Sequence, residues 1–132
     1  MSETSKGNIL LVDDDKFLLD MYAMKFHGQG YAVASCLSVG EALEALKRGF
    51  TADVILFDLT MPERDGFSFL QSLRDDHLGE HAIKIALSNQ TDDAEKAKAA
   101  ELGAGRYIVK ASMIPSEVVA VVAEELAKRK TA

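Results

Sequence analysis

Residues 53–66 read DVILFDLTMPERDG, and this stretch decides the fold. A nearly continuous apolar run at 53–57 ends at Asp58, and after a loop containing Pro62 the pair Asp65-Gly66 marks the start of a helix. A short apolar run without polar alternation is typical of a strand that is buried on both faces of a parallel sheet. The stretch is therefore predicted to form a strand, a loop and a helix.

The same unit recurs on both sides of this stretch. Further short apolar segments lie at 8–12, 31–35, 82–87 and 106–109. Helix signals separate them: a Ser38–Glu41 capping box closed by Gly49, Thr91 followed by two aspartates and closed by Gly103, and Pro115 in the first turn of the last helix. About five strands alternating with about five helices predict an α/β fold, an open doubly wound parallel sheet with helices on both faces.

Composition limits the possible functions. The 132 residues suit one domain, which we expect at 8–129 between a flexible N-terminal tail, 1–7, and a C-terminal tail, 130–132. The single cysteine excludes a disulfide framework, and no apolar run is long enough to cross a bilayer or to serve as a secretion signal, so we expect a cytoplasmic protein. A net charge of -6 argues against nucleic-acid binding by this domain.

Polar side chains follow several of the predicted strands. Asp13 and Asp14 come after the first strand and Asp58 after the third. Ser88 and Lys110 come after the fourth and the fifth. Because the carboxyl ends of parallel strands share one edge of a sheet, these side chains are expected to meet there. Clustered carboxylates repel one another unless a cation joins them, and an all-oxygen donor set suits Mg²⁺, with Lys110 and Ser88 left to hold phosphoryl oxygens.

The motifs resemble those of the receiver domain of two-component response regulators over nearly the whole chain. They are the acidic pair in ILLVDDD, the acceptor in DVILFDLTMPERDG, the hydroxyl in IALSN, and the lysine with a tyrosine three residues before it in GAGRYIVK. Each motif is weak alone, but their order and spacing are specific. The resemblance implies a five-stranded sheet in the order 2-1-3-4-5.

The resemblance also implies a role for each site residue. Asp58 would take a phosphoryl group from a histidine kinase or a histidine phosphotransfer protein. Asp14, Asp58 and the backbone carbonyl of Thr60 would bind Mg²⁺ directly, and Asp13 would act through a coordinated water. Lys110 and Ser88 would bind phosphoryl oxygens, and Tyr107 would turn inward as Ser88 moves. The protein would then be a signalling switch and not an enzyme with a small-molecule product.

Partner surfaces are expected on two sides of the domain. The resemblance places contacts with a downstream target on the face formed by the fourth helix, the fifth strand and the fifth helix. The fourth helix offers mostly alanine to the core, which favours its displacement. Apolar residues of the first helix, and Val118, Val119, Val121 and Val122 of the last, are either buried layers of the domain or surfaces for a kinase and for a second copy.

Two positions depart from the family pattern. Lys110 is followed by Ala111 where the family usually has proline, often after a cis peptide bond, so the form of this bond is left open. Ser88 is followed by Asn89 where a small residue is usual, and this larger polar side chain is expected to alter the lifetime of the phosphoryl group.

Other functions are compatible with some of these residues. A receiver that binds partners without phosphorylation keeps the same fold. The motif FDLT also resembles that of haloacid dehalogenase-like phosphatases, but Thr60 stands where their second aspartate is expected. A flavodoxin-like FMN site conflicts with the acid after the first strand, which would repel the FMN phosphate. Asp15 is predicted to be a helix cap and Cys36 to be inert, and the three histidines are assigned no chemistry.

Overall fold

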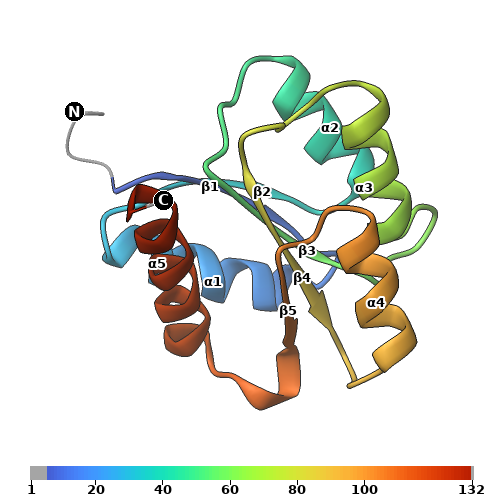
Figure 1. The fold of residues 1–132 in the computed structure, drawn as a ribbon. Helices are drawn as coiled ribbons and strands as arrows, with labels where there is room; N and C mark the ends of the chain where they lie inside the picture. Colours follow the sequence, from blue (N-terminus) through green and yellow to red (C-terminus); the bar gives the residue numbers. More distant parts are fainter. Residues whose placement is uncertain (1–5, 132) are drawn as a thin grey trace.

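The computed structural model describes residues 6–131 and shows a sheet with helices on both faces (Figure 1). The strands are β1 (Asn8–Val12), β2 (Ala32–Cys36), β3 (Val54–Asp58), β4 (Ile83–Ser88) and β5 (Arg106–Val109). The helices are α1 (Lys16–Gly28), α2 (Val39–Lys47), α3 (Gly66–Asp75), α4 (Asp93–Glu101) and α5 (Pro115–Thr131), with a 3-10 turn, η2, at Lys110–Ser112. This alternation is the predicted one.

All pairings in the sheet are parallel, and the strand order is β2-β1-β3-β4-β5, which confirms the order 2-1-3-4-5. Figure 1 shows α1 and α5 on one side of the sheet and α2, α3 and α4 on the other. The strand order reverses direction between β1 and β3. The crevice at the carboxyl ends of these two strands is therefore the place where such a fold binds ligands.

The central strands divide their side chains between two cores. Leu10 and Ile55 face the core that includes α2 and α3, whereas Ile9 and Leu56 face the core that includes α1 and α5. All four are fully buried, because successive residues of a strand point to opposite faces and both faces are covered. The continuous apolar runs of the sequence are explained by this double burial.

Most helix boundaries follow the predicted signals. Ser38 caps α2 through a hydrogen bond from the backbone N–H of Glu41 to Ser38 Oγ, and Asp65 and Asp15 cap α3 and α1 in the same way. One prediction is wrong by a residue: Asp92 and not Thr91 caps α4, because the Asp92 carboxylate reaches the backbone N–H of Glu95 at 3.1 Å. Gly49 and Gly103 follow α2 and α4 with positive φ, as expected of residues that end helices.

The domain limits 8–129 stay a prediction. Residues 1–5 and 132, which belong to the expected tails, lie outside the described residues. The backbone N–H of Lys6 donates to the carbonyl of Gly30, and the carbonyl of Gly7 accepts from Ala32. At the other end α5 continues to Thr131.

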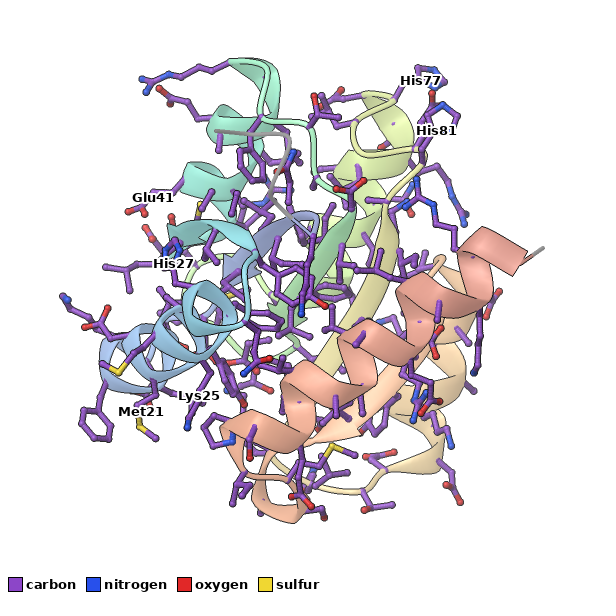
Figure 2. The ribbon with its side chains drawn as sticks, turned by 90° about the vertical axis from the view of Figure 1, so that its left-hand side faces the viewer. Met21, Lys25, His27, Glu41, His77 and His81 are labelled. Atoms are coloured by element: carbon purple, nitrogen blue, oxygen red, sulfur yellow. The ribbon has the colours of Figure 1, made fainter. Side chains whose placement is uncertain are left out.

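The apolar side chains of α1 and α5 that could form partner surfaces differ in exposure. Val118, Val119, Val121 and Val122 are all buried in the core beneath α5, so these valines are core residues and not a surface for a second copy. On α1, Phe17 and Met24 are exposed, and Figure 2 shows Met21 and Lys25 pointing outward from the same helix. Within residues 6–131, no helix has both the length and the apolar character that crossing a bilayer requires.

Helix α4 is held by few apolar contacts. Ala99 is its one buried residue, and the Lys98 ammonium lies 4.5 Å from the centre of the Phe67 ring on α3. A single buried methyl group contributes little to the free energy of folding, so α4 depends on polar contacts to stay in place. This confirms the expectation that alanine dominates the buried side of this helix.

Gly66 fixes how closely α3 approaches the end of β3. A Cβ atom added at Gly66 would lie 2.6 Å from the Asp58 carbonyl oxygen and 2.8 Å from Leu59 Cα. Both neighbours are backbone atoms, which cannot turn aside as a side chain can. Glycine is therefore required here for packing and not for an unusual φ.

Replacing Gly66 by alanine is expected to destabilise the protein by about 1–3 kcal/mol, because the added methyl group overpacks the backbone at Asp58. Urea unfolding followed by circular dichroism measures the effect. The matched control is Gly40→Ala on α2, where the nearest atom is Ser38 Oγ at 3.8 Å. That variant should gain about 0.5–1 kcal/mol from helix propensity. Equal stability of the two variants would contradict the assigned close approach.

Candidate functional site

Three carboxylates meet at the carboxyl ends of β1 and β3. Asp13, Asp14 and Asp58 each offer an oxygen atom, and these atoms lie within 4.8 Å of one another. Asp13 and Asp58 are buried, with 1% and 2% of their surface exposed, whereas Asp14 faces solvent. The predicted acidic cluster is therefore present, with one side open.

The backbone holds the two buried carboxylates in place. Asp58 is the last residue of β3, and its Oδ1 accepts a hydrogen bond of 3.2 Å from the backbone N–H of Thr60. Asp13 Oδ1 accepts a hydrogen bond of 2.9 Å from the backbone N–H of Asp15, at the start of α1. Each carboxylate thus keeps its other oxygen, Oδ2, for the interior of the site.

Lys110 supplies the positive charge at this edge. Its Nζ lies 2.8 Å from Asp13 Oδ2 and 3.2 Å from Asp58 Oδ2, and the side chain is 13% exposed. No cis peptide bond occurs within residues 6–131, so the Lys110–Ala111 bond, left open by the sequence, is trans. The lysine therefore reaches the cluster from η2 without the family's usual proline.

The buried charges shift one another's pKa values. Burial raises the pKa of Asp58 to about 6, because desolvation penalises the carboxylate more than the Lys110 charge favours it, and the neighbouring Asp13 raises it further. Burial alone lowers the pKa of Lys110, but its close contact with Asp13 and the charges of Asp58 and Asp13 outweigh burial and raise it. The site therefore favours a proton or a cation among its carboxylates.

The donor set fits a hard divalent cation such as Mg²⁺. All the groups are oxygen donors, and three carboxylates face a single ammonium, so a cation would balance the excess negative charge. Asp13 Oδ2 supports this fit, because it is buried and receives no hydrogen bond of acceptable geometry, its ionic contact with Lys110 aside. A buried carboxylate oxygen of this kind is a ready ligand for a metal or its bound water.

Ser88 and Tyr107 form a separate hydrogen-bond network beside the carboxylates. The Ser88 hydroxyl, at the end of β4, lies 2.7 Å from Glu95 Oε1 and 2.8 Å from the carbonyl oxygen of Gln90. The Tyr107 hydroxyl on β5 lies 2.8 Å from the same carbonyl and 3.0 Å from the same carboxylate oxygen. Ser88 therefore directs its proton toward α4 and not toward Asp58.

Glu95, which no sequence pattern identified as a site residue, joins this network. The pattern Asp92-Asp93-Ala94-Glu95 places an acid three residues after a helix cap, where a capping box is the expected structure. The carboxylate instead contacts Ser88 and Tyr107. No local signal in the sequence distinguishes these two uses.

His77 and His81 lie away from the site, whereas Cys36 lies beside it, because its carbonyl accepts a hydrogen bond of 3.1 Å from the backbone N–H of Asp13. Figure 2 places His77 and His81 at the outer margin of the molecule, and His81 precedes β4, at the opposite end of that strand from Ser88. Cys36 is buried at the end of β2, and burial raises the pKa of its thiol to about 11. A thiol with this pKa is a weak nucleophile, which agrees with the expectation that Cys36 is inert.

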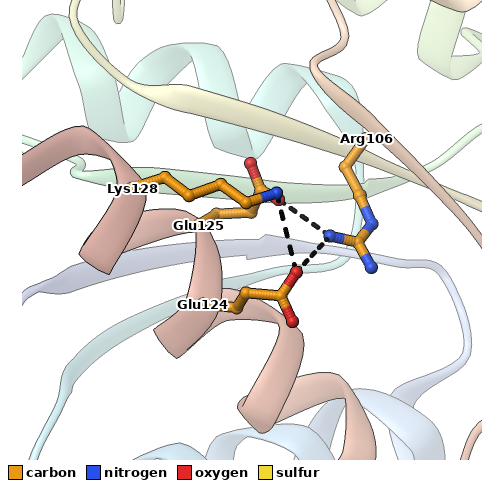
Figure 3. A network of polar contacts seen from close by, with 4 residues as sticks. All are labelled: Arg106, Glu124, Glu125 and Lys128. Atoms are coloured by element: carbon orange, nitrogen blue, oxygen red, sulfur yellow. Dashed lines mark hydrogen bonds and ion pairs between the residues drawn. The ribbon is translucent and has the colours of Figure 1, made fainter. Parts of the chain in front are cut away.

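A network of ion pairs covers the outer edge of the sheet (Figure 3). Arg106 on β5 lies 3.1 Å from Glu124 and 2.8 Å from Glu125 on α5, and Lys128 contacts the same two carboxylates. Glu124 and Lys128 are exposed and Arg106 is partly exposed, so the contribution of these ion pairs to stability is small. Their effect is to fix β5, the edge strand that carries Tyr107, against α5.

Comparison with known proteins points to one family. Residues 9–123 match the family described as "Response regulator receiver domain". The DNA-binding response regulator MtrA of Mycolicibacterium smegmatis is 31% identical over 118 residues, which cover 89% of this chain and 50% of that protein. The chain thus spans about half the length of curated relatives such as MtrA.

Solved structures agree. A response regulator receiver domain protein (CheY-like) from Methanospirillum hungatei superposes with a TM-score of 0.85 at 24% identity, covering 96% of this chain and 98% of that one, and shows the shared fold. The receiver domain of the Francisella response regulator 1452 is 28% identical with a TM-score of 0.81, covering 95% of this chain and 99% of that one.

The raised pKa of Asp58 predicts a pH-dependent stability in the absence of divalent metal. Because the folded pKa of about 6 lies above the ordinary value of 3.8, the protonated carboxyl stabilises the fold. That contribution is complete below pH 4 and is lost as the pH rises through 6. Asp58→Asn removes this loss and leaves Lys110 paired with Asp13.

Between pH 4 and pH 7.5 the stability of Asp58→Asn should therefore rise relative to wild type, by up to ~3 kcal/mol. Urea unfolding in the presence of EDTA at a series of pH values measures it. Asp75→Asn, at the exposed end of α3, controls for the loss of a surface carboxylate. A difference between Asp58→Asn and wild type that is independent of pH would contradict the assigned pKa.

Proposed function

The chain belongs to the family of response regulator receiver domains, and from this premise we propose that Asp58 accepts a phosphoryl group and thereby changes which partners the domain binds. The observation that carries the proposal is the arrangement of Asp13, Asp14 and Asp58 around the Lys110 ammonium at the sheet edge. Proteins of this family are signalling components and not metabolic enzymes. The proposed output is therefore a change of conformation.

The chemistry assigned to Asp58 is nucleophilic. Its carboxylate oxygen forms a bond to phosphorus as the bond from phosphorus to the imidazole nitrogen of a phosphohistidine breaks. We assign Asp14, Asp58 and the backbone carbonyl of Thr60 as Mg²⁺ ligands, with Asp13 acting through water. When bound, the ion supplies positive charge to the phosphoryl oxygens. Asp58 must be ionised to attack, and Lys110 favours this form because it lowers the pKa of Asp58.

Lys110 has a second part in the proposal. Its ammonium lies between two buried carboxylates, so it can turn from Asp58 Oδ2 to an added phosphoryl oxygen without leaving Asp13. A charge-assisted hydrogen bond to that oxygen would hold the new group in one orientation. The Ser88 hydroxyl would supply a second hydrogen bond after it leaves its present acceptors.

Partner binding is assigned to two surfaces. A histidine kinase or a histidine phosphotransfer protein would dock on α1, which begins just after Asp13 and Asp14 and on which Phe17 and Met24 are exposed. A downstream target, or a second copy of the chain, would bind the face of α4, β5 and α5, which includes the ion pairs of Arg106. A net charge of -6 argues against nucleic-acid binding by this domain. We place the domain in the cytoplasm, where such kinases donate phosphoryl groups.

Phosphorylation is tested by incubating the protein with Mg²⁺ and acetyl phosphate and measuring its intact mass. The wild-type protein should gain about 80 Da, the mass of one phosphoryl group on an aspartate nucleophile, and Asp58→Asn should not gain it. Asp15→Asn is the matched control, because it removes a neighbouring exposed carboxylate yet keeps a side chain that can cap α1. No mass gain by the wild type would favour a receiver that binds partners without phosphorylation.

Asn89 is expected to set the lifetime of the phosphoryl group. It is exposed and directly follows Ser88, and we propose that its amide lies where water approaches the site. Asn89→Ala should change the rate of spontaneous dephosphorylation by a few fold, because it removes a group able to hydrogen-bond that water. The rate is measured from the decay of the phosphorylated mass after acetyl phosphate is removed. Identical decay of the variant and the wild type would disprove this role.

A further inference from the structure

Glu95 connects three structural elements through one oxygen atom. It lies in the first turn of α4, and its Oε1 is 2.7 Å from Ser88 Oγ on β4 and 3.0 Å from the Tyr107 hydroxyl on β5. The residue is only partly exposed, so this contact is shielded from solvent. Since Ala99 is the only buried residue of α4, Glu95 provides a main attachment of this helix to the sheet.

The two hydroxyl protons of this network are both used in hydrogen bonds. Ser88 and Tyr107 each have one hydroxyl proton, and the acceptors within reach of both are Glu95 Oε1 and the Gln90 carbonyl. The backbone N–H of Gln90 in turn donates to Ser88 Oγ at 3.2 Å. Ser88 therefore cannot donate to a group on Asp58 unless it gives up a bond in this network.

Glu95 does not make the helix-capping hydrogen bond that its position in α4 predicts. In α2, Glu41 occupies the same place relative to its cap, and its Oε1 accepts a hydrogen bond of 2.9 Å from the backbone N–H of Leu37, preceding the helix. In α4 the corresponding carboxylate accepts its bonds from Ser88 and Tyr107. Helix capping there is left to Asp92 alone. The orientation of Glu95 is therefore not explained by the needs of its own helix.

We propose that Glu95 is a positioning residue that holds the Ser88 proton away from the phosphoryl site. Glu95 thereby raises the free energy that the domain needs to reach its activated conformation. This inference rests on the proposed function, because the group that competes for Ser88 is the phosphoryl group on Asp58. When Ser88 turns to that group, Glu95 loses the Ser88 hydroxyl as a hydrogen-bond donor. The first turn of α4 then loses one of its two attachments, which couples the site to the partner-binding face.

The test measures the affinity for beryllofluoride with Mg²⁺, a mimic of the aspartyl phosphate, by titration calorimetry. Glu95→Gln keeps the shape of the side chain but removes its charge, so Ser88 is released more readily and binding should tighten about fivefold. Glu101→Gln is the matched control, because it removes one exposed charge from the same helix and should leave the affinity unchanged. In a Ser88→Ala background, Glu95→Gln should have no effect, since the proton it controls is absent.

A second measurement needs no metal. The charge and hydrogen bond of Glu95 act to raise the pKa of the Tyr107 hydroxyl, in addition to the larger effect of its burial. Carbon-13 NMR of labelled tyrosine, with Tyr107→Phe for assignment, should show a lower Tyr107 pKa in Glu95→Gln and no change in Glu101→Gln.

The outcomes separate the two proposals. A wild-type protein that does not bind beryllofluoride would overturn the proposed function and this inference with it. Wild-type binding combined with an unchanged affinity in Glu95→Gln would overturn this inference alone. The same gain in affinity with and without Ser88 would also overturn it, because Glu95 would then act by another route.

Discussion

The repulsion among three carboxylates at one edge of the sheet is the constraint on which the site depends. Asp13 and Asp58 are almost fully buried and share one ammonium, that of Lys110, so their charge is incompletely balanced. Desolvation by burial raises the pKa of Asp58 to about 6, and the charge of Asp13 adds a smaller increase. A site built this way is stable with a proton or a cation and less stable without either, which makes its occupancy a source of free energy for conformational change.

The fold packs one side of the site firmly and the other side weakly. Asp13 and Asp58 extend from β1 and β3, whose side chains fill both cores. Ser88 ends β4, Tyr107 lies on the edge strand β5, and Glu95 belongs to a helix with one buried residue. A change at Asp58 is therefore expected to displace α4 and not β1 or β3, because α4 is held weakly and its displacement costs the least free energy.

Much of this structure could be predicted from the sequence, for identifiable reasons. Continuous apolar runs such as 53–57 and caps such as Ser38 and Asp65 are local signals, and they predicted the parallel sheet and most helix starts. Glu95 could not be predicted, because its contacts with Ser88 and Tyr107 join residues 7 and 12 positions away along the chain. The sequence also could not predict that Phe17 is exposed and Val122 is buried. Apolar residues on an amphipathic helix do not show how wide a face of that helix the core covers.

The small buried surface of α4 has a consequence for the evolution of such domains. Of the residues at Asp93–Glu101, only Ala99 is buried, so the exposed ones, unlike Glu95, can be replaced with little effect on the folded state. A duplicated copy of this protein could acquire a new recognition surface there while its core and its acidic cluster stay unchanged. Weak packing of one helix would in this way let related domains diverge in their partners while preserving a common chemistry.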